Sequence, residues 1–488
     1  MSRILVGPFN RVEGDLEVTL DTATDHVRSA RVNSPLYRGF EQILLGHAPM
    51  DALVYTPRIC GICSVSQSVA CARALADLME IQMPANGQHC SNLILANENM
   101  TDLLTHFYLF FMPDFARPIY SSEPWYGHVV QRFKATQGSA ARVMLPARAD
   151  FLHLMGLLAG KWPHTLSLQP GGTTKPVEAQ ERVRLLAVIA AFRRFLEQEL
   201  FGDDLERIAS LDSLQALDQW RAEKPWHSSD FRTFLHISDY LQLHSLGRAT
   251  DQFLSYGTYP QPTDAGISRK IFQSGIYMGS EHLPLNPAAI TEDISHAWMS
   301  GANKPLHPSQ GITHPSLDNP EGYSWCKAPR LNHQVVEVGA LARQLVNHHP
   351  LAQDLVTLQG GNVHSRTVAR MLELAIVIPQ MQAWVKAIDP NEPFCLHGRL
   401  PDEGRGVGLI EAARGSLGHW LEVKKGKIHN YQIIAPTSWN FSPRDQQAVP
   451  GPLEQALENA PIRAGETDPV AVQHIVRSFD PCIACTVH

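Results

Sequence analysis

Two pairs of cysteines, each with the spacing Cys-x-x-Cys, lie near opposite ends of the chain. The first pair is Cys60 and Cys63, and the second is Cys482 and Cys485. Thiolates are soft ligands for zinc, copper, nickel or iron, and two intervening residues let both sulfurs of a pair face one ion. We therefore predict a buried four-thiolate metal site that forms only when the two ends of the chain meet.

The cysteine spacing is also compatible with simpler roles. Two such pairs most often form a structural zinc site. The pairs of such a site usually lie roughly 15–20 residues apart, whereas here nearly the whole chain separates them. A thioredoxin-like redox pair belongs to a short strand–helix unit, which neither pair has. Core cysteines can also have this spacing by chance. Ligand preference alone favours zinc or iron–sulfur before nickel, so the metal stays open on the cysteines alone.

A metal site shared by both ends argues for one interlocked unit, although a length of 488 residues would suggest roughly three domains. The composition, 44% hydrophobic and 18% charged, is typical of a soluble globular protein. The formal charge of -7 gives no basic patch for nucleic acid or a membrane surface. Eight cysteines in so long a chain do not make a disulfide framework, and in a reducing compartment a cysteine pair more often binds metal.

The ends and the apolar stretches of the chain suggest its location. Residues 1–8 lack the apolar core of a secretory signal. The most apolar stretches, such as residues 107–112 and 185–192, are too short to span a bilayer. We expect a cytoplasmic protein without direct membrane insertion.

Alternating apolar and polar residues predict an antiparallel hairpin from residue 3 to about residue 33. Within it, Arg11 and Glu13 are most simply interpreted as a surface ion pair. Ser64 is expected to cap a helix over residues 65–79. Cys63 would then lie beside a helix N-terminus, where the dipole favours a thiolate.

Further elements follow from apolar periodicity and turn residues. Asp102 lies in a predicted helix, where a lone acid is more often on the polar face. Residues 283–320, rich in Pro, His, Gly and Asn, are expected to form a long ordered loop. Helices are predicted over residues 90–111, 178–200 and about 337–388, and a second hairpin over residues 421–434 with a Lys-Lys-Gly-Lys turn.

Nine short motifs, taken together, resemble the large, catalytic subunit of nickel–iron hydrogenases from end to end. They occur in the order of that family. They are RVEG at 11, RICGIC at 58, GKWPH at 160, PGG at 170, YSWCKAPR at 323, EVGALAR at 337, ARGSLGHW at 413, APTSWN at 435 and DPCIACTVH at 480.

The resemblance implies a specific metal centre. Cys60, Cys63, Cys482 and Cys485 would hold nickel, and Cys63 and Cys485 would also bridge to an iron that carries carbon monoxide and cyanide ligands. The implied reaction is the heterolytic cleavage or formation of dihydrogen, in which the metal polarises the H–H bond while a nearby base takes the proton.

The resemblance also assigns catalytic residues. The thiolate of Cys482 is the family's favoured first proton acceptor, and the guanidine of Arg414 is its rival or helper. Glu13 matches the carboxylate of the proton relay, which replaces the ion-pair interpretation. Asp102 and Asp480 match the acids that position the arginine, and a buried arginine needs such partners.

Two further groups of residues are implied in the same way. Thr437, after Pro436, matches a hydroxyl that donates to a cyanide nitrogen, which would otherwise lack a partner. Glu41, the carbonyl of Ile433 and His488 match a magnesium site.

Departures from the family pattern narrow the expectation. Gln67 and Asp15 stand where the family commonly has histidines, and both resemble the hydrogen-sensing, regulatory branch. Gln67 can donate to a bridging sulfur through its amide but cannot be protonated. Ile62 and Phe110 stand where energy-converting members tend to have Val and Leu, so they either narrow a hydrophobic gas path or simply fill the core differently. Ala413 replaces the usual Pro before the arginine.

The expected fold is a predominantly helical α+β protein, with a core of long helices and small antiparallel sheets near both ends. We expect residues 1–488 to form one interlocked domain, with an N-terminal hairpin at about 3–33, a helical core at about 50–390 and a C-terminal hairpin and metal-binding tail at about 405–488. Most family members carry an extension after the last motif. Its absence here matches either the sensing branch or a mature form.

The remaining cysteines indicate where electrons go. Cys71, Cys90, Cys326 and Cys395 have no cluster spacing, so iron–sulfur clusters are expected in a partner small subunit. Candidate further partners are a sensor histidine kinase and a second heterodimer. The expected function is hydrogen sensing by a low-turnover enzyme. The alternatives are a cytoplasmic uptake hydrogenase that feeds respiration, a structural four-thiolate zinc protein, and a quinone-binding relative of the same fold, which lacks the cysteine pairs.

Overall fold

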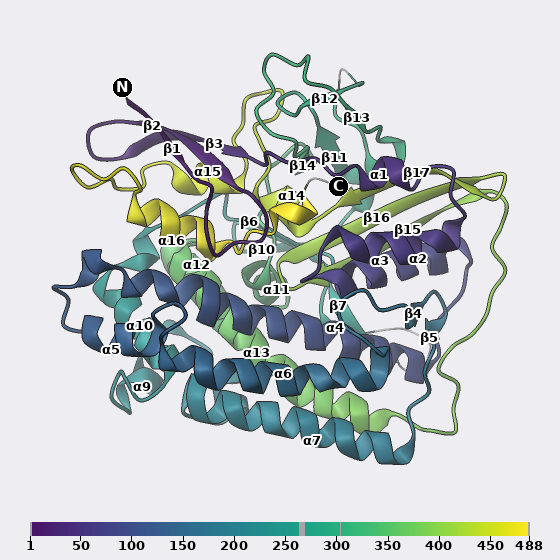
Figure 1. Ribbon diagram of the computed structural model, residues 1–488, viewed down its shortest axis with the longest axis horizontal. Helices are drawn as coiled ribbons and strands as arrows, with labels where there is room; N and C mark the ends of the chain where they lie inside the picture. Colours follow the sequence, from purple (N-terminus) through teal and green to yellow (C-terminus); the bar gives the residue numbers. More distant parts are fainter. Residues whose placement is uncertain (1, 263–268, 303, 487–488) are drawn as a thin grey trace.

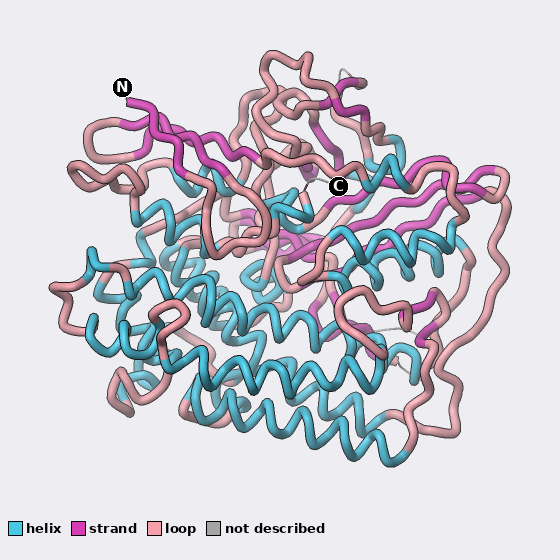
Figure 2. The backbone as a smooth tube through the Cα atoms, viewed as in Figure 1, coloured by secondary structure: helices cyan, strands magenta, loops and turns pink. Residues whose placement is uncertain are grey.

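The computed structural model describes residues 2–262, 269–302 and 304–486. Long helices occupy one side of the molecule, and small antiparallel sheets lie on the other (Figures 1 and 2). This arrangement confirms the predicted helical α+β fold with sheets near both ends of the chain. No helix among these residues combines the length and the apolar character needed to cross a bilayer.

Four long helices form the helical side. They are α4 (Ala85–Thr105), α6 (Ser139–Ala159), α7 (Ala179–Phe195) and α13 (Val363–Ala387). Helix α4 contacts both α6 and α13, so it is buried along almost its whole length and its polar residues must find partners inside the protein. The predicted helices 90–111 and 178–200 each end in a π-helical turn, at His106–Phe111 and Leu196–Phe201.

Shorter helices complete the helical part and the connections. The predicted helical region at about 337–388 contains α11 (Ala340–Val346) and α12 (Pro350–Gln359) before α13. The others are α1 (Phe40–Ile43), α2 (Ala52–Tyr55), α3 (Ser64–Leu78), α5 (Tyr126–Phe133), α8 (Leu205–Ala209), α9 (Leu214–Ala222), α10 (Asp230–Tyr240), α14 (Pro436–Asn440), α15 (Pro452–Leu457) and α16 (Val470–Ser478).

The N-terminal hairpin is part of a three-stranded sheet. Its strands are β1 (Ser2–Val6), β2 (Glu17–Thr22) and β3 (Val27–Asn33), paired in the order β1-β2-β3. β2 and β3 form the predicted hairpin, and β1 pairs antiparallel with β2. Residues 7–16 therefore form a loop that leaves the sheet and returns to it, and this loop carries Glu13.

The C-terminal sheet packs directly on helix α3. Its strands are β15 (Gly404–Ala412), β16 (Gly415–Lys424) and β17 (Lys427–Ile434), so the predicted hairpin gains a third strand. A Cβ atom at Gly408 would lie 1.9 Å from the carbonyl oxygen of Ala70 on α3, and one at Gly406 would lie 2.0 Å from that of Ala74. Glycine at both positions lets the strand and the helix approach this closely.

The predicted loop at 283–320 contains short strands in its described part. β11 (Ile290–Asp293) pairs with β14 (Ala328–Leu331), and β12 (Met299–Ser300) pairs with β13 (His314–Pro315). Each of these pairings joins two segments that are separated in sequence, so the local composition of the loop could not predict the strands. The remaining strands are β4 (Leu168–Gln169), β5 (Gly172–Thr173), β6 (Gln252–Ser255), β7 (Thr258–Gln261), β8 (Arg269–Phe272), β9 (Gly275–Met278) and β10 (Glu281–Leu283).

Candidate metal centre

The first cysteine pair lies at the start of helix α3, but Ser64 does not cap this helix as predicted. The helix begins at Ser64, and Cys63 is the residue before it. The carboxylate of Glu98, from α4, accepts hydrogen bonds from the backbone N–H groups of Val65 and Ser66, both at 2.8 Å. Burial raises the pKa of Glu98 to about 7. A neighbouring helix therefore caps α3, which local sequence could not show.

The second cysteine pair lies in the tail that follows α16, against the N-terminal loop. The N–H of Ile483 donates to the carbonyl of Glu13 at 2.7 Å, and the N–H of Glu13 donates to the carbonyl of Pro481 at 3.3 Å. Gly14 has φ +81, and a Cβ there would lie 2.8 Å from the backbone nitrogen of Ala484. The close packing of the two segments thus requires glycine at this position.

The four cysteines converge in the core. All four are buried, and their sulfurs lie within 4.8 Å of one another. The Sγ–Sγ distances are 2.9 Å for Cys482–Cys485, 3.1 Å for Cys63–Cys485 and 3.5 Å for Cys60–Cys482. All four are free thiols, not disulfides. No other group of three or more His, Cys, Asp or Glu in the described part of the chain could hold a metal ion.

The chemistry of this donor set fits a soft transition metal. The sulfur of Cys482, together with burial, raises the pKa of the Cys63 and Cys485 thiols well above the usual value. Thiols this close and this buried can therefore ionise together only when a cation compensates their charge. An all-sulfur set favours nickel, iron, zinc or copper over magnesium or calcium.

A fixed guanidinium lies in the same buried region. Arg414 stands in the tight turn between β15 and β16, and its Nε donates to the carbonyl of Asp480 at 3.0 Å. Its two terminal nitrogens donate to both carboxylate oxygens of Asp102, and one of them also lies 3.2 Å from Asp480 Oδ1. Burial opposes the charge of Arg414, but the two carboxylates raise its pKa well above the usual value. The side chain therefore stays protonated and held in place.

Asp102 is not on a polar face of its helix. Its side chain is buried, and it points from helix α4 to Arg414. Asp480 has φ +55 in the tail, two residues before Cys482. Neither position is evident from helical periodicity alone.

Glu13 is half-buried beside the cysteine cluster. Burial and the nearby Cys60 raise its pKa, and Arg414 and Arg38 oppose this shift. Its backbone forms a parallel bridge with Cys482. The prediction that Arg11 and Glu13 form a surface ion pair is wrong, because Arg11 pairs with Asp114.

Several other sequence-predicted residues lie around the cysteines. Gln67 is one helical turn after Cys63 on α3, and its Oε1 lies 2.8 Å from His419 Nε2. The hydroxyl oxygen of Thr437 accepts from the backbone N–H of Cys482 at 3.1 Å. Pro436, which opens α14, directly precedes Thr437, and Ala413 directly precedes Arg414. Both residues are buried.

The residues predicted for magnesium are only partly described. Glu41 is buried, and its Oε1 accepts from the backbone N–H of Ile433 at 2.8 Å. Lys327 Nζ, which sequence reasoning missed, lies 3.2 Å from Glu41 Oε2 and 3.1 Å from Glu292 Oε2. His488 lies outside the described residues. Only the position of Lys327 in the YSWCKAPR motif could have indicated its importance from the sequence.

The two residues predicted to line a gas path, Ile62 and Phe110, lie on different elements of the fold. Ile62, between the first two cysteines, is half-buried and packs against the main hydrophobic core. Phe110 is half-buried in the π-helical turn that follows α4.

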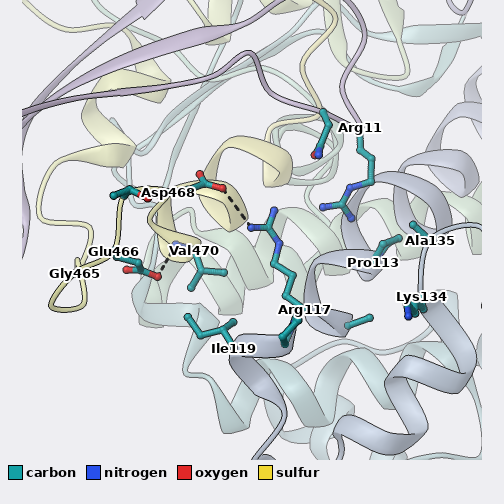
Figure 3. A pocket seen from close by; sticks show the side chains of 14 residues that line it. Arg11, Pro113, Arg117, Ile119, Lys134, Ala135, Gly465, Glu466, Asp468 and Val470 are labelled. Atoms are coloured by element: carbon teal, nitrogen blue, oxygen red, sulfur yellow. Dashed lines mark hydrogen bonds and ion pairs between the residues drawn. The ribbon is translucent and has the colours of Figure 1, made fainter.

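A cavity of about 710 Å³ lies on another part of the surface (Figure 3). It is lined by charged residues that include Arg11, Arg117, Glu466 and Asp468, and by no cysteine. Beside it, the fully buried Asp114 accepts from Arg11, from Arg117 and, at 2.7 Å, from Arg477 on α16. Asp114 thus ties the loop that carries Glu13 to the helix that leads into the second cysteine pair.

We expect Asp114→Asn to lower the free energy of unfolding by about 3–5 kcal/mol, because it leaves the buried Arg477 and the partly buried Arg11 and Arg117 without their shared carboxylate. Burial alone would raise the pKa of Asp114, but His474, Arg477 and Arg11 hold it well below the usual range. A carboxyl with a depressed pKa stabilises the fold above its unfolded pKa of about 4 and loses this effect at lower pH. Denaturant unfolding should therefore show the largest difference above about pH 4 and a smaller one below.

Asp468→Asn is the matched control for this prediction. Asp468 is 55% exposed and lies 3.7 Å from Arg117. An exposed pair of this kind contributes about 0–1 kcal/mol. Equal losses in the two variants would contradict the role given to Asp114.

Comparisons with known proteins agree with this geometry. A family model described as "Nickel-dependent hydrogenase" matches residues 38–121 and 143–488. The periplasmic [NiFeSe] hydrogenase large subunit of Desulfomicrobium baculatum is 27% identical over 523 residues, covering 100% of this chain and 95% of that protein. The uptake hydrogenase large subunit of Rhizobium leguminosarum bv. viciae is 28% identical over 593 residues, covering 100% and 95%.

Solved structures show the same fold. The reduced, active form of the Ni-Fe-Se hydrogenase from Desulfomicrobium baculatum matches with a TM-score of 0.86 at 26% identity, covering 100% of both chains. The reduced Ni-Fe-Se hydrogenase from D. vulgaris Hildenborough matches with a TM-score of 0.84 at 28% identity, with the same coverage.

Proposed function

The chain belongs to the nickel-dependent hydrogenase family as a large subunit, and from this premise we propose that its four clustered cysteines hold a nickel–iron centre at which dihydrogen is cleaved heterolytically. The observation that carries this proposal is the convergence of four buried sulfurs within 4.8 Å beside a fixed guanidinium. When bound, the centre supplies the Lewis acidity that polarises the H–H bond.

The side chains around the cysteines divide the proton chemistry. Arg414 is paired with two carboxylates and remains protonated, so it supplies positive charge instead of accepting a proton. This favours the Cys482 thiolate as the first acceptor. Glu13, whose backbone pairs with that of Cys482 and whose pKa is raised by burial, is placed to take the proton next and pass it toward solvent.

Other residues would complete the centre. The oxygen of Thr437 accepts from Cys482, so its hydroxyl hydrogen can donate to a cyanide on the iron. Carbon monoxide is the other proposed iron ligand. We place a magnesium site at Glu41, the carbonyl of Ile433 and His488. We also infer that residues 1–488 fold as one interlocked domain, since one hydrophobic core includes residues from Val6 to Cys485.

A small subunit that carries iron–sulfur clusters would take the electrons. Within the described residues, Cys71, Cys90, Cys326 and Cys395 join no group that could hold a metal. The segment before Cys60 also exposes several large apolar side chains, which suit a protein interface. They are Leu36, Ile43, Leu45 and Val54.

The biological role we propose is hydrogen sensing by a cytoplasmic complex that signals through a histidine kinase, with two heterodimers in the assembly. Gln67 and Asp15 support it, because both differ from the histidines common in the family. Ile62 and Phe110 support it because they are bulkier than the Val and Leu that energy-converting members tend to have, and so would narrow a hydrophobic gas path. The second candidate is an uptake enzyme, which the similarity to uptake hydrogenase large subunits favours.

Isotope exchange and turnover test this proposal. The purified heterodimer should form HD from dihydrogen in D2O and reduce an artificial dye at fewer than about 10 turnovers per second, the median for enzymes. Faster turnover would favour the uptake role. A complex without any exchange activity would contradict the function itself.

A further inference from the structure

A chain of buried hydrogen bonds runs from helix α3 through the C-terminal sheet and back to α3. Gln67 Oε1 lies 2.8 Å from His419 Nε2, and His419 Nδ1 lies 2.8 Å from the hydroxyl of Tyr431. The thiol of Cys71, one turn beyond Gln67, contacts the same hydroxyl. All four residues are at most 1% exposed.

The direction of these bonds follows from the groups themselves. Gln67 Oε1 can only accept, so Nε2 of His419 carries the hydrogen. A neutral imidazole has one N–H, so Nδ1 of His419 accepts the hydrogen of the Tyr431 hydroxyl. In this arrangement the amide oxygen of Gln67 fixes the histidine tautomer, and the Tyr431 hydroxyl supplies the donor that the other ring nitrogen requires.

The selected orientation leaves one strong donor for the metal centre. Gln67 Nε2 is buried and has no hydrogen-bond partner among the described residues. A buried donor without a partner costs about 1–3 kcal/mol. Gln67 stands four residues after Cys63, so the two side chains lie on the same face at the start of α3.

We propose that His419 and Tyr431 are positioning residues that hold the Gln67 amide with its NH2 group toward the cysteine cluster. This inference rests on the proposed nickel–iron centre and adds to it a fixed hydrogen-bond donor. Such a donor withdraws electron density from a metal-bound thiolate and so alters the electron density at the metals.

The opposite orientation requires every bond in the chain to reverse. The amide NH2 would donate to His419 Nε2, the hydrogen would move to Nδ1, and the Tyr431 hydroxyl would have to accept it. The oxygen of Gln67 would then face the sulfurs, where lone pairs and thiolate charge repel. The thiolate charge therefore favours the arrangement in which the NH2 group faces the cysteine cluster, and His419 and Tyr431 complete the hydrogen bonds of that arrangement.

The test uses infrared bands of iron-bound carbon monoxide and cyanide in the complex with its small subunit, with nickel content measured alongside. We expect Tyr431→Phe to shift these bands or split them into two sets at unchanged nickel content. Tyr259→Phe is the matched control, because Tyr259 is also fully buried and its hydroxyl bonds Asn99 at 2.9 Å. It should leave the bands unchanged.

A double substitution separates positioning from general disturbance. Gln67→Leu should shift the bands, and adding Tyr431→Phe to it should cause no further shift, because the effect passes through the amide. His419→Gln, whose amide can still donate and accept, should keep one set of bands, whereas His419→Leu should shift them. This pair decides the matter even where Tyr431→Phe fails to fold.

Two results would overturn the inference. One is an unchanged spectrum in Tyr431→Phe and His419→Leu, and the other is an equal shift from Tyr431→Phe with and without Gln67. The absence of such bands in the unaltered protein is a different outcome, because it would remove the proposed nickel–iron centre itself.

Discussion

Cys485→Ser should reduce the nickel content of the purified protein to less than about a tenth of its normal value and abolish dihydrogen cleavage. The sulfur of Cys485 lies 2.9 Å from that of Cys482 and 3.1 Å from that of Cys63, at the centre of the donor set. A serine hydroxyl is a harder ligand that does not ionise readily, so one of four ligands is lost. Metal analysis and HD formation measure the two effects.

Cys90→Ser is the control for this substitution. Cys90 is 1% exposed, so it carries a similar cost for burying a hydroxyl, but it does not belong to the sulfur cluster. The variant should keep its nickel and its activity. Nickel retained in Cys485→Ser, or lost equally in both variants, would contradict the assignment of the ligands.

Glu13→Gln should lower turnover by about 10²–10⁴-fold while nickel content stays unchanged, since it removes a proton carrier but keeps the shape of the side chain. Burial and Cys60 raise the pKa of Glu13, so its ionisation should appear in the dependence of rate on pH above the usual carboxyl range. That limb of the profile should disappear in the variant.

Glu17→Gln is the matched control for the relay. Glu17 lies four residues away in the same N-terminal segment and accepts from Asn33 at 3.0 Å in the sheet. Its substitution should leave turnover and the pH profile unchanged. Full turnover in Glu13→Gln would show that protons leave the site by another route.

Part of the fold and of the site could be predicted because the relevant signals are local. Alternation predicted β2 and β3, and the Cys-x-x-Cys spacing together with the end-to-end motifs predicted that both ends meet at one metal site. Strand β1 was missed as a separate strand, because its pairing with β2 across a ten-residue loop leaves no local pattern.

The residues that sequence reasoning missed act through partners far along the chain. Glu98 caps a helix that begins 34 residues earlier, and Lys327 forms ion pairs with both Glu41 and Glu292 in the core. Asp114 joins Arg11 to Arg477 across more than 360 residues. A buried charge needs a partner, but the sequence does not identify which residue supplies it.

The most direct test of the nickel–iron centre is an infrared spectrum of the purified complex, taken together with its metal content. We expect stretching bands of iron-bound carbon monoxide and cyanide, with one nickel per large subunit. Zinc in place of nickel, with no such bands, would contradict this account and make the four cysteines a structural site.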